Sequence, residues 1–194
     1  MPFVLTVDQR ASRRTGDRVD LALDALRTVE TVLPFERTAG DEFQGLVQDP
    51  AAVVDVVLRL TRLGGWRIGI GAGPVQTPLP PSTRAGAGPA FLGARRAVEA
   101  AKQRSAGVAV RGAVPAEAGD AQGVLTALAV IVGRRSDHAW EAIDLVGAGW
   151  TQARAADALG ISRQAVGQRL AAGLWELEQE LRPTACRLLA RSEG

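Results

Sequence analysis

The apolar and polar positions follow one pattern in the first part of the chain and another in the second. In the first part, short apolar runs alternate with segments whose apolar residues recur every three or four positions, which predicts alternating strands and helices. The predicted strands cover residues 3–7, 35–38, 43–47, 66–71 and 108–111, and the predicted helices cover residues 17–32, 51–63 and 90–104. This order is that of a ferredoxin-like split βαβ fold with one further helix and strand.

The second part shows only the helical spacing. Helices are predicted over residues 124–134, 139–146, 151–159 and 162–181, with a last helix that begins near Pro183. Residues 112–122, rich in Gly, Ala and Pro, separate the two patterns and predict a domain boundary. We therefore expect an α+β protein with a ferredoxin-like βαββαβ domain at residues 1–115 and an all-α helix-turn-helix domain at residues 116–194.

Residues 151–170 carry the landmarks of a helix-turn-helix. Thr151 and Ser162 stand where two short helices would begin and are suited to cap them, and Gly160 is suited to end the first helix in the left-handed conformation. The small residues Ala155 and Ala156 allow the second helix to cross closely above the first. The stretch resembles the helix-turn-helix of sigma-factor region 4 and related bacterial regulators. The alternative is an ordinary helical hairpin with exposed polar residues.

This resemblance implies double-stranded DNA as a partner. Near the N-terminus of the second helix, a polar face lies opposite the apolar stripe, where such a helix meets base edges in the major groove. Arg and Gln are suited to bidentate pairs with guanine and adenine there, and other polar residues are placed for phosphates. The candidates for bases are Arg163, Gln164, Gly167 and Gln168; those for the DNA backbone are Thr151, Gln152, Arg154 and Arg169, with Ser162 beside them as the cap.

The helices after Gly173 have two possible roles. One helix-turn-helix unit binds DNA weakly alone, and dimers that contact two half-sites are the common solution. The apolar residues between Trp175 and Leu189 therefore either supply a dimer surface or close the core of their own domain. We expect a homodimer.

Two aspartates are predicted to meet at one edge of the sheet. Asp8 follows the first strand, and Asp41 is in the turn before the third strand, which is the antiparallel neighbour of the first in a ferredoxin-like sheet. Two carboxylates placed in this way could share Mg²⁺ together with the phosphates of a nucleotide. Taken singly, Asp41 is also an ordinary turn residue and Asp8 an ordinary cap.

Four segments resemble the SatD family of bacterial proteins. They are Asp8-Gln-Arg-Ala-Ser-Arg, Thr38-Ala-Gly-Asp-Glu-Phe-Gln-Gly-Leu, Arg67-Ile-Gly-Ile-Gly-Ala-Gly and Gly88-Pro-Ala-Phe-Leu-Gly-Ala-Arg. More remotely, the layout resembles the palm domain of class III nucleotidyl cyclases and GGDEF diguanylate cyclases. That resemblance implies metal positions at Asp8 and Asp41. It also implies nucleotide contacts at Gln9, Arg10, Ala11, Ser12, Arg13, Arg95 and Arg96.

The match to an active cyclase is incomplete. Class III cyclases have an asparagine four residues before a transition-state arginine, and alignment on Arg95 places Phe91 at that position. Ala39 replaces the first glycine of the GGDEF signature. We therefore assign no catalytic residue and expect a DNA-binding transcriptional regulator whose first domain binds a nucleotide or cyclic nucleotide. The alternatives are a first domain that is only a dimerisation scaffold, and an active metal-dependent nucleotidyl cyclase.

Composition changes this picture little. The chain is 46% apolar and 23% charged, and its net charge of +2 means that DNA contact depends on where the arginines are placed. No apolar run reaches the roughly 18–20 residues that span a bilayer, and the start of the chain lacks the basic region of a signal peptide. The single Cys186 suits a reducing compartment. We expect a cytoplasmic protein with no membrane partner.

Overall fold

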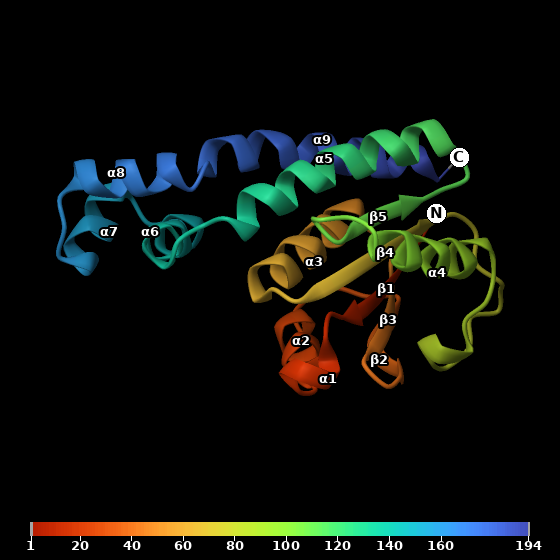
Figure 1. Cartoon of the computed structure of the whole chain (residues 1–194). Coiled ribbons are helices and arrows are strands. Elements are labelled where there is room, and N and C mark those ends of the chain that lie inside the picture. The colour runs from red at the N-terminus through yellow and green to blue at the C-terminus, as the bar shows by residue number, and fades with distance from the viewer. Residues whose placement is uncertain (1, 194) are drawn as a thin grey trace.

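The computed structural model describes residues 2–193 and has the mixed α and β composition that the sequence predicts (Figure 1). The strands are β1 (Phe3–Gln9), β2 (Leu33–Ala39), β3 (Glu42–Val47), β4 (Trp66–Ala72) and β5 (Val108–Arg111). The helices are α1 (Ser12–Thr15), α2 (Val19–Leu26), α3 (Pro50–Leu63), α4 (Pro89–Ala101), α5 (Pro115–Gly133), α6 (Asp137–Gly147), α7 (Gln152–Leu159), α8 (Arg163–Ala172) and α9 (Trp175–Ser192), with a 3-10 turn at Thr83–Ala85. Within residues 2–193, no helix is both long and apolar enough to cross a membrane.

β1 is the central strand of the sheet. The strand order is β2-β3-β1-β4-β5, with β1 antiparallel to β3 and to β4, and β4 parallel to β5. β1 can occupy the centre because it is apolar on both faces: Val4 packs with α4, whereas Phe3 and Leu5 belong to the core under α3. The antiparallel pairing of the first and third strands is confirmed.

Two glycines of β4 allow α4 to lie directly on the sheet. A Cβ atom at Gly69 would overlap the backbone of Val98, and one at Gly71 would overlap the backbone of Ala90, so only glycine fits at either position. The opposite face of the sheet is covered by α2, α3, α5 and α9, whose apolar residues share one core with β1 and β4.

α5 begins earlier than the sequence predicts. Residues 112–122 are predicted to form a loop, whereas α5 starts at Pro115, a residue tolerated in the first turn of a helix. Ala118 and Ala121 are buried in the core of the sheet, so tertiary contacts override the weak helix propensity of the glycines around them. The apolar core therefore continues across the predicted domain boundary between residues 115 and 116.

α8 and α9 are two helices where the spacing of residues 162–181 predicts one. The chain turns at Leu174, whose φ of 51° is left-handed, and Pro183 is inside α9 instead of at a helix start. α9 packs against the main core, where Leu189 is fully buried. The buried residues of α9 thus pack on the core of the sheet, not on the core of the helical domain to which the sequence assigns this segment, and the dimer surface stays a prediction. α2 is also shorter than the helix predicted over residues 17–32.

α6, α7 and α8 enclose a second, smaller apolar core at one end of the molecule, away from the sheet (Figure 1). The long helices α5 and α9 lie side by side over the sheet and extend toward this end. Ala155 of α7 and Val166 of α8 are completely buried in the smaller core. α5 and α9 thus connect the smaller helical core to the core of the sheet.

Arg135, directly after α5, and Glu178 of α9 form a buried ion pair. Their Nη1 and Oε2 atoms are 2.7 Å apart, and the side chains are only 1% and 4% exposed. The Nε of Arg135 donates to the carbonyl of Gly173 at the end of α8 (2.7 Å), and its guanidinium lies 4.8 Å from the ring of Trp140 in α6. Arg62 of α3 stacks on the same ring at 3.9 Å. We call these five residues the junction.

Replacement of Gly119 or Gly123 by Ala is expected to stabilise the protein. Both glycines are exposed within α5 and have no atom within 4 Å of an added Cβ, and Ala favours a helix interior over Gly by about 0.8–1.0 kcal/mol. Urea denaturation should show a higher midpoint for each variant. Gly69→Ala, which forces a Cβ into the backbone of Val98, is the control that should lower it. A lower midpoint for Gly119→Ala would contradict a helix at this position.

Glu178→Gln is expected to cost about 3–5 kcal/mol of unfolding free energy, because it leaves Arg135 charged, buried and uncompensated. The matched control is Asp24→Asn, which breaks the exposed ion pair between Asp24 and Arg27 and should cost less than about 1 kcal/mol. Guanidinium denaturation of the three proteins makes the comparison. An equal loss of unfolding free energy in the two variants would show that the buried ion pair stabilises the protein no more than an exposed one.

Candidate functional sites

An open cavity of about 380 Å³ lies at the edge of the sheet where β1 ends. We call it the β1-edge cavity. Asp8 and Asp41 both line it, so the structure brings the two predicted aspartates to one place. The antiparallel register between β1 and β3 is the cause: it pairs Asp8 with Glu42, the neighbour of Asp41. The cavity is lined by Asp8, Gln9, Ala11, Ser12, Arg13, Arg14, Asp41, Arg67 and Lys102.

Asp8 already has a cationic partner. Its Oδ2 accepts a hydrogen bond from Nη1 of Arg67 at 2.9 Å, and its side chain is 17% exposed. The register of β1 against β4 places these two residues directly opposite each other. Asp41 contributes its carbonyl to the local structure, which accepts a hydrogen bond from the backbone N–H of Gln9 (3.1 Å).

Cations outnumber carboxylates in the β1-edge cavity. Arg13, Arg14, Arg67 and Lys102 face two aspartates there. A hydrogen bond to Glu99 (2.6 Å) raises the pKa of Lys102, and the negative charge of Asp8 adds to this effect, so the ammonium stays charged at neutral pH. Such a set of donors suits the oxygens of a phosphate group.

The β1-edge cavity offers fewer ligands for a metal ion than donors for a phosphate group. Among residues 2–193, no three His, Cys, Asp or Glu side chains gather as a metal site. Asp8 and Asp41 could supply two oxygen ligands to Mg²⁺, which commonly takes one or two carboxylates together with waters and substrate phosphates. A metal ion at Asp8 would have to compete with the guanidinium of Arg67.

Residues at the end of β1 and in the loop that follows have two roles: some line the β1-edge cavity, and others stabilise the loop. Ala11, in a left-handed conformation with a φ of 54°, turns the chain sharply, and Ser12 and Arg13 line the β1-edge cavity as predicted for a phosphate loop. The side chain of Gln9 is buried and bonds to Thr15, Gly16 and Arg18, which stabilises the loop itself.

Arg10 departs from the predicted arrangement. Its Nη2 donates to the carbonyls of Arg104 (3.3 Å) and Ser105 (3.4 Å), on the side away from the residues that line the β1-edge cavity. Sequence reasoning placed Arg10 with its neighbours because it assigned the loop as a unit, whereas Arg10 precedes the left-handed turn at Ala11 and bonds to the loop before β5.

The predicted arginines of α4 lie elsewhere. Arg95 pairs with Glu42 at 3.3 Å, and Arg96 lines a different cavity together with Arg111. Neither lines the β1-edge cavity. Phe91, which stands at the asparagine position of class III cyclases, is a buried core residue of the face covered by α4.

Sequence reasoning missed Arg14, which is one residue beyond the predicted phosphate loop, and also Arg67 and Lys102. Arg67 comes from β4 and Lys102 from the end of α4, both distant from Asp8 along the chain. For Arg67 a signal existed: two strands of equal length in antiparallel register place it opposite Asp8. Lys102, the one lysine of the chain, offered no pattern that predicts its direction.

The caps predicted for α7 and α8 are present. The Oγ1 of Thr151 accepts from the N–H of Arg154 (3.2 Å), and the Oγ of Ser162 accepts from the N–H of Ala165 (3.1 Å). Gly160 ends α7 with a left-handed φ of 65°. The two caps therefore fix where α7 and α8 begin, and Gly160 fixes where α7 ends.

The predicted DNA-contacting residues divide into free and engaged side chains. Those exposed on the surface are Thr151, Gln152, Ser162, Arg163, Gln164 and Gln168. Arg154 is also exposed but stacks on the ring of Trp150 at 3.8 Å. Arg169 pairs with Glu141 of α6 at 2.7 Å. Gly167 is half-buried, and its Cβ position points toward Gln152 of α7.

Comparisons of the chain with models of known protein families, with curated proteins and with solved structures gave no match. The geometry of the two sites is therefore the basis for a functional assignment.

Proposed function

We propose that the protein is a DNA-binding transcriptional regulator that contacts double-stranded DNA through α7 and α8. The observation that carries this proposal is the pair of side-chain caps at Thr151 and Ser162 together with the left-handed Gly160 between them. They fix two short helices at a tight turn, which is the local geometry of a helix-turn-helix.

The surface that α8 presents supports the same assignment. Arg163 and Gln164 occupy its first turn, and Gln168 follows one turn later; all three are exposed. α8 contains no acidic residue, and the positive end of its dipole is at this first turn. Arginine and glutamine at the start of a helix are the side chains that form bidentate contacts with guanine and adenine.

Two of the residues predicted to contact the DNA backbone already interact with other side chains, which changes what each can contribute to the interface. Because Arg169 is paired with Glu141, it does not carry a free charge to the DNA backbone. Arg154, stacked on Trp150, keeps its charge at the surface and is the better phosphate contact. The homodimer stays a prediction, and α9 is largely occupied with the core of its own chain.

The β1-edge cavity is the second part of the proposal: it binds a nucleotide or cyclic nucleotide as a signal. The strand order β2-β3-β1-β4 supports a palm-like, ferredoxin-type domain and with it the SatD resemblance. Four cationic side chains around Asp8 and Asp41 suit phosphate oxygens, with Mg²⁺ as a possible bridging ion. Phe91 is buried, so α4 supplies no polar group at the position of the cyclase asparagine, which favours binding over turnover.

Loss of DNA binding is expected when α8 loses its exposed polar groups. The double variant Arg163→Ala, Gln168→Ala should bind specific DNA at least about 30-fold more weakly, because each of the two lost bidentate contacts contributes about 1–3 kcal/mol. A genome-wide binding map supplies the target sequences, and fluorescence anisotropy at fixed salt measures the affinity. The matched control is Gln179→Ala, Arg187→Ala, which removes the same residue types from the exposed surface of α9. Retained peaks in the first variant would refute the proposed interface.

Nucleotide binding is expected to depend on cations of the β1-edge cavity. Calorimetry with ATP, GTP, cyclic AMP and cyclic di-GMP, each with and without Mg²⁺, should find a binder whose affinity falls about tenfold or more in Lys102→Gln. Arg27→Gln, at an exposed pair on α2, is the control and should bind normally. If none of the nucleotides binds, the first domain is a scaffold. Formation of a cyclic product that Asp41→Asn abolishes would instead establish the cyclase alternative.

A further inference from the structure

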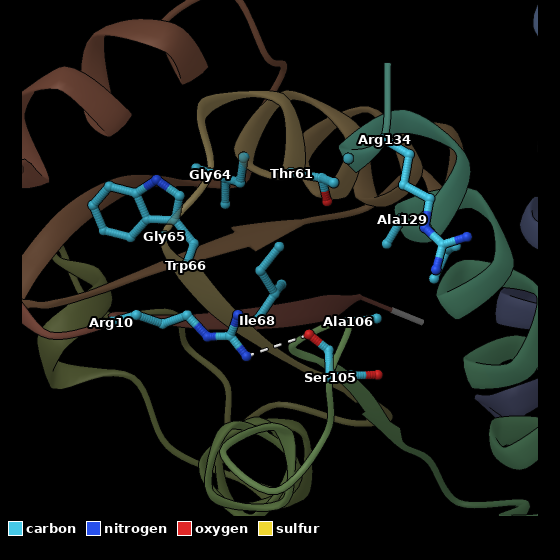
Figure 2. Close-up of a pocket in the computed structure, with 13 residues that line it drawn as sticks. Arg10, Thr61, Gly64, Gly65, Trp66, Ile68, Ser105, Ala106, Ala129 and Arg134 are labelled. Carbon is cyan, nitrogen blue, oxygen red and sulfur yellow. Dashed lines mark hydrogen bonds between the residues drawn. The ribbon is translucent and has the colours of Figure 1, made fainter. Parts of the chain in front are cut away.

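A second cavity, of about 330 Å³, lies between the sheet and α5. We call it the α5 cavity. Its walls come from the end of α3, the start of β4, the loop that contains Ser105 and the last turns of α5 (Figure 2). Its volume is within the range of about 300–1,000 Å³ that is usual for small-molecule sites. None of the predicted nucleotide or DNA contacts lines it except Arg10.

Two arginines and no acidic residue line the α5 cavity. In Figure 2, Arg10 enters from the left, from the end of β1, and Arg134 from the right, directly after α5. Among residues 2–193, neither Arg10 nor Arg134 forms an ion pair, whereas the adjacent Arg62 and Arg135 do. The cavity thus holds two positive charges that the described part of the chain leaves uncompensated.

The guanidinium of Arg10 is held in position for a ligand. Its Nη2 donates to the carbonyls of Arg104 and Ser105, which fixes the side chain at the cavity without neutralising its charge. Among residues 2–193, the only hydrogen bonds of this guanidinium are those of Nη2, so Nε and Nη1 can donate to an acceptor from outside. A guanidinium fixed in this way loses little further freedom when it binds a carboxylate or phosphate.

The remaining walls are largely apolar. Leu60 and Ile68 come from the main core, and Ala129 comes from α5. An apolar wall lowers the local dielectric and strengthens the attraction between a guanidinium and an anion. We infer that the α5 cavity is a binding site for a small organic anion, whose carboxylate or phosphate binds Arg10 in the field of Arg134 and whose apolar body lies against Ile68 and Ala129.

The site is independent of the proposed function, because it requires neither nucleotide nor DNA. Its position gives it contact with both ends of the molecule. Arg10 precedes the loop residues of the β1-edge cavity, and Arg134 directly precedes Arg135 of the junction. An anion in the α5 cavity would therefore contact one residue adjacent in sequence to the β1-edge cavity and one adjacent to the junction.

The test measures binding of phenyl phosphate, benzoate and inorganic phosphate to the full chain by calorimetry, with neutral benzamide as the comparison probe. Phenyl phosphate should bind more tightly than inorganic phosphate, and benzamide should not bind. Arg134→Gln should weaken phenyl phosphate about tenfold or more; this side chain makes no described hydrogen bond, so its loss should leave the thermal midpoint unchanged. Arg10→Gln should weaken it similarly, and the exposed control Arg27→Gln should have no effect.

Lys102→Gln separates the two cavities, because Lys102 lines the β1-edge cavity and not the α5 cavity. The inference holds if phenyl phosphate binds this variant normally. It is overturned if no probe binds, if benzamide binds as well as benzoate, or if Lys102→Gln weakens phenyl phosphate while Arg134→Gln does not. A failure of nucleotide binding in the earlier experiment would leave this result unaffected, so the two proposals fail separately.

Discussion

The position of the small helical core relative to the sheet depends on one buried guanidinium. Arg135 pairs with the carboxylate of Glu178, donates to the carbonyl of Gly173 after α8 and lies against the ring of Trp140, so α5, α6, α8 and α9 meet at a single side chain. Burying this charge is costly, and the pair repays the cost only because each partner remains in place. An apolar contact would tolerate small rotations of the helices more readily than the hydrogen bond to Gly173 and the buried ion pair. The small helical core is therefore held in one orientation relative to the sheet.

Features that depend on neighbouring residues could be predicted from the sequence. The strands, the amphipathic helices and the caps at Thr151, Gly160 and Ser162 follow from local periodicity and local hydrogen bonding. Two helix boundaries could not be predicted, because contacts distant in sequence decide them. Ala118 and Ala121 draw a glycine-rich stretch into α5, and the contacts of the junction accompany a break at Leu174 within an otherwise helical pattern.

The candidate nucleotide site also has features that the sequence predicts and features that it does not. The meeting of Asp8 and Asp41 follows from strand order, which the sequence of elements predicts. The direction of each side chain depends on the local backbone, and the left-handed turn at Ala11 separates Arg10 from Ser12 although they are two residues apart in one loop. Lys102 and Arg67 reach the cavity from elements that only the folded chain brings near Asp8. The chemistry of the cavity was thus predicted in its acidic half and missed in much of its basic half.

The left-handed turn at Leu174 has a consequence for how far the helical end can be regarded as a module. A non-glycine residue in this conformation costs about 1–2 kcal/mol, and the residues on either side would otherwise favour an unbroken helix. The direction of α8 is set in part by partners outside its own segment: Val166 packs against α6, Arg169 pairs with Glu141, and Arg135 donates to the carbonyl of Gly173. A graft of residues 151–172 onto another protein would transfer the caps and the exposed side chains. It would not transfer the orientation of α8, which depends on contacts with the rest of this chain.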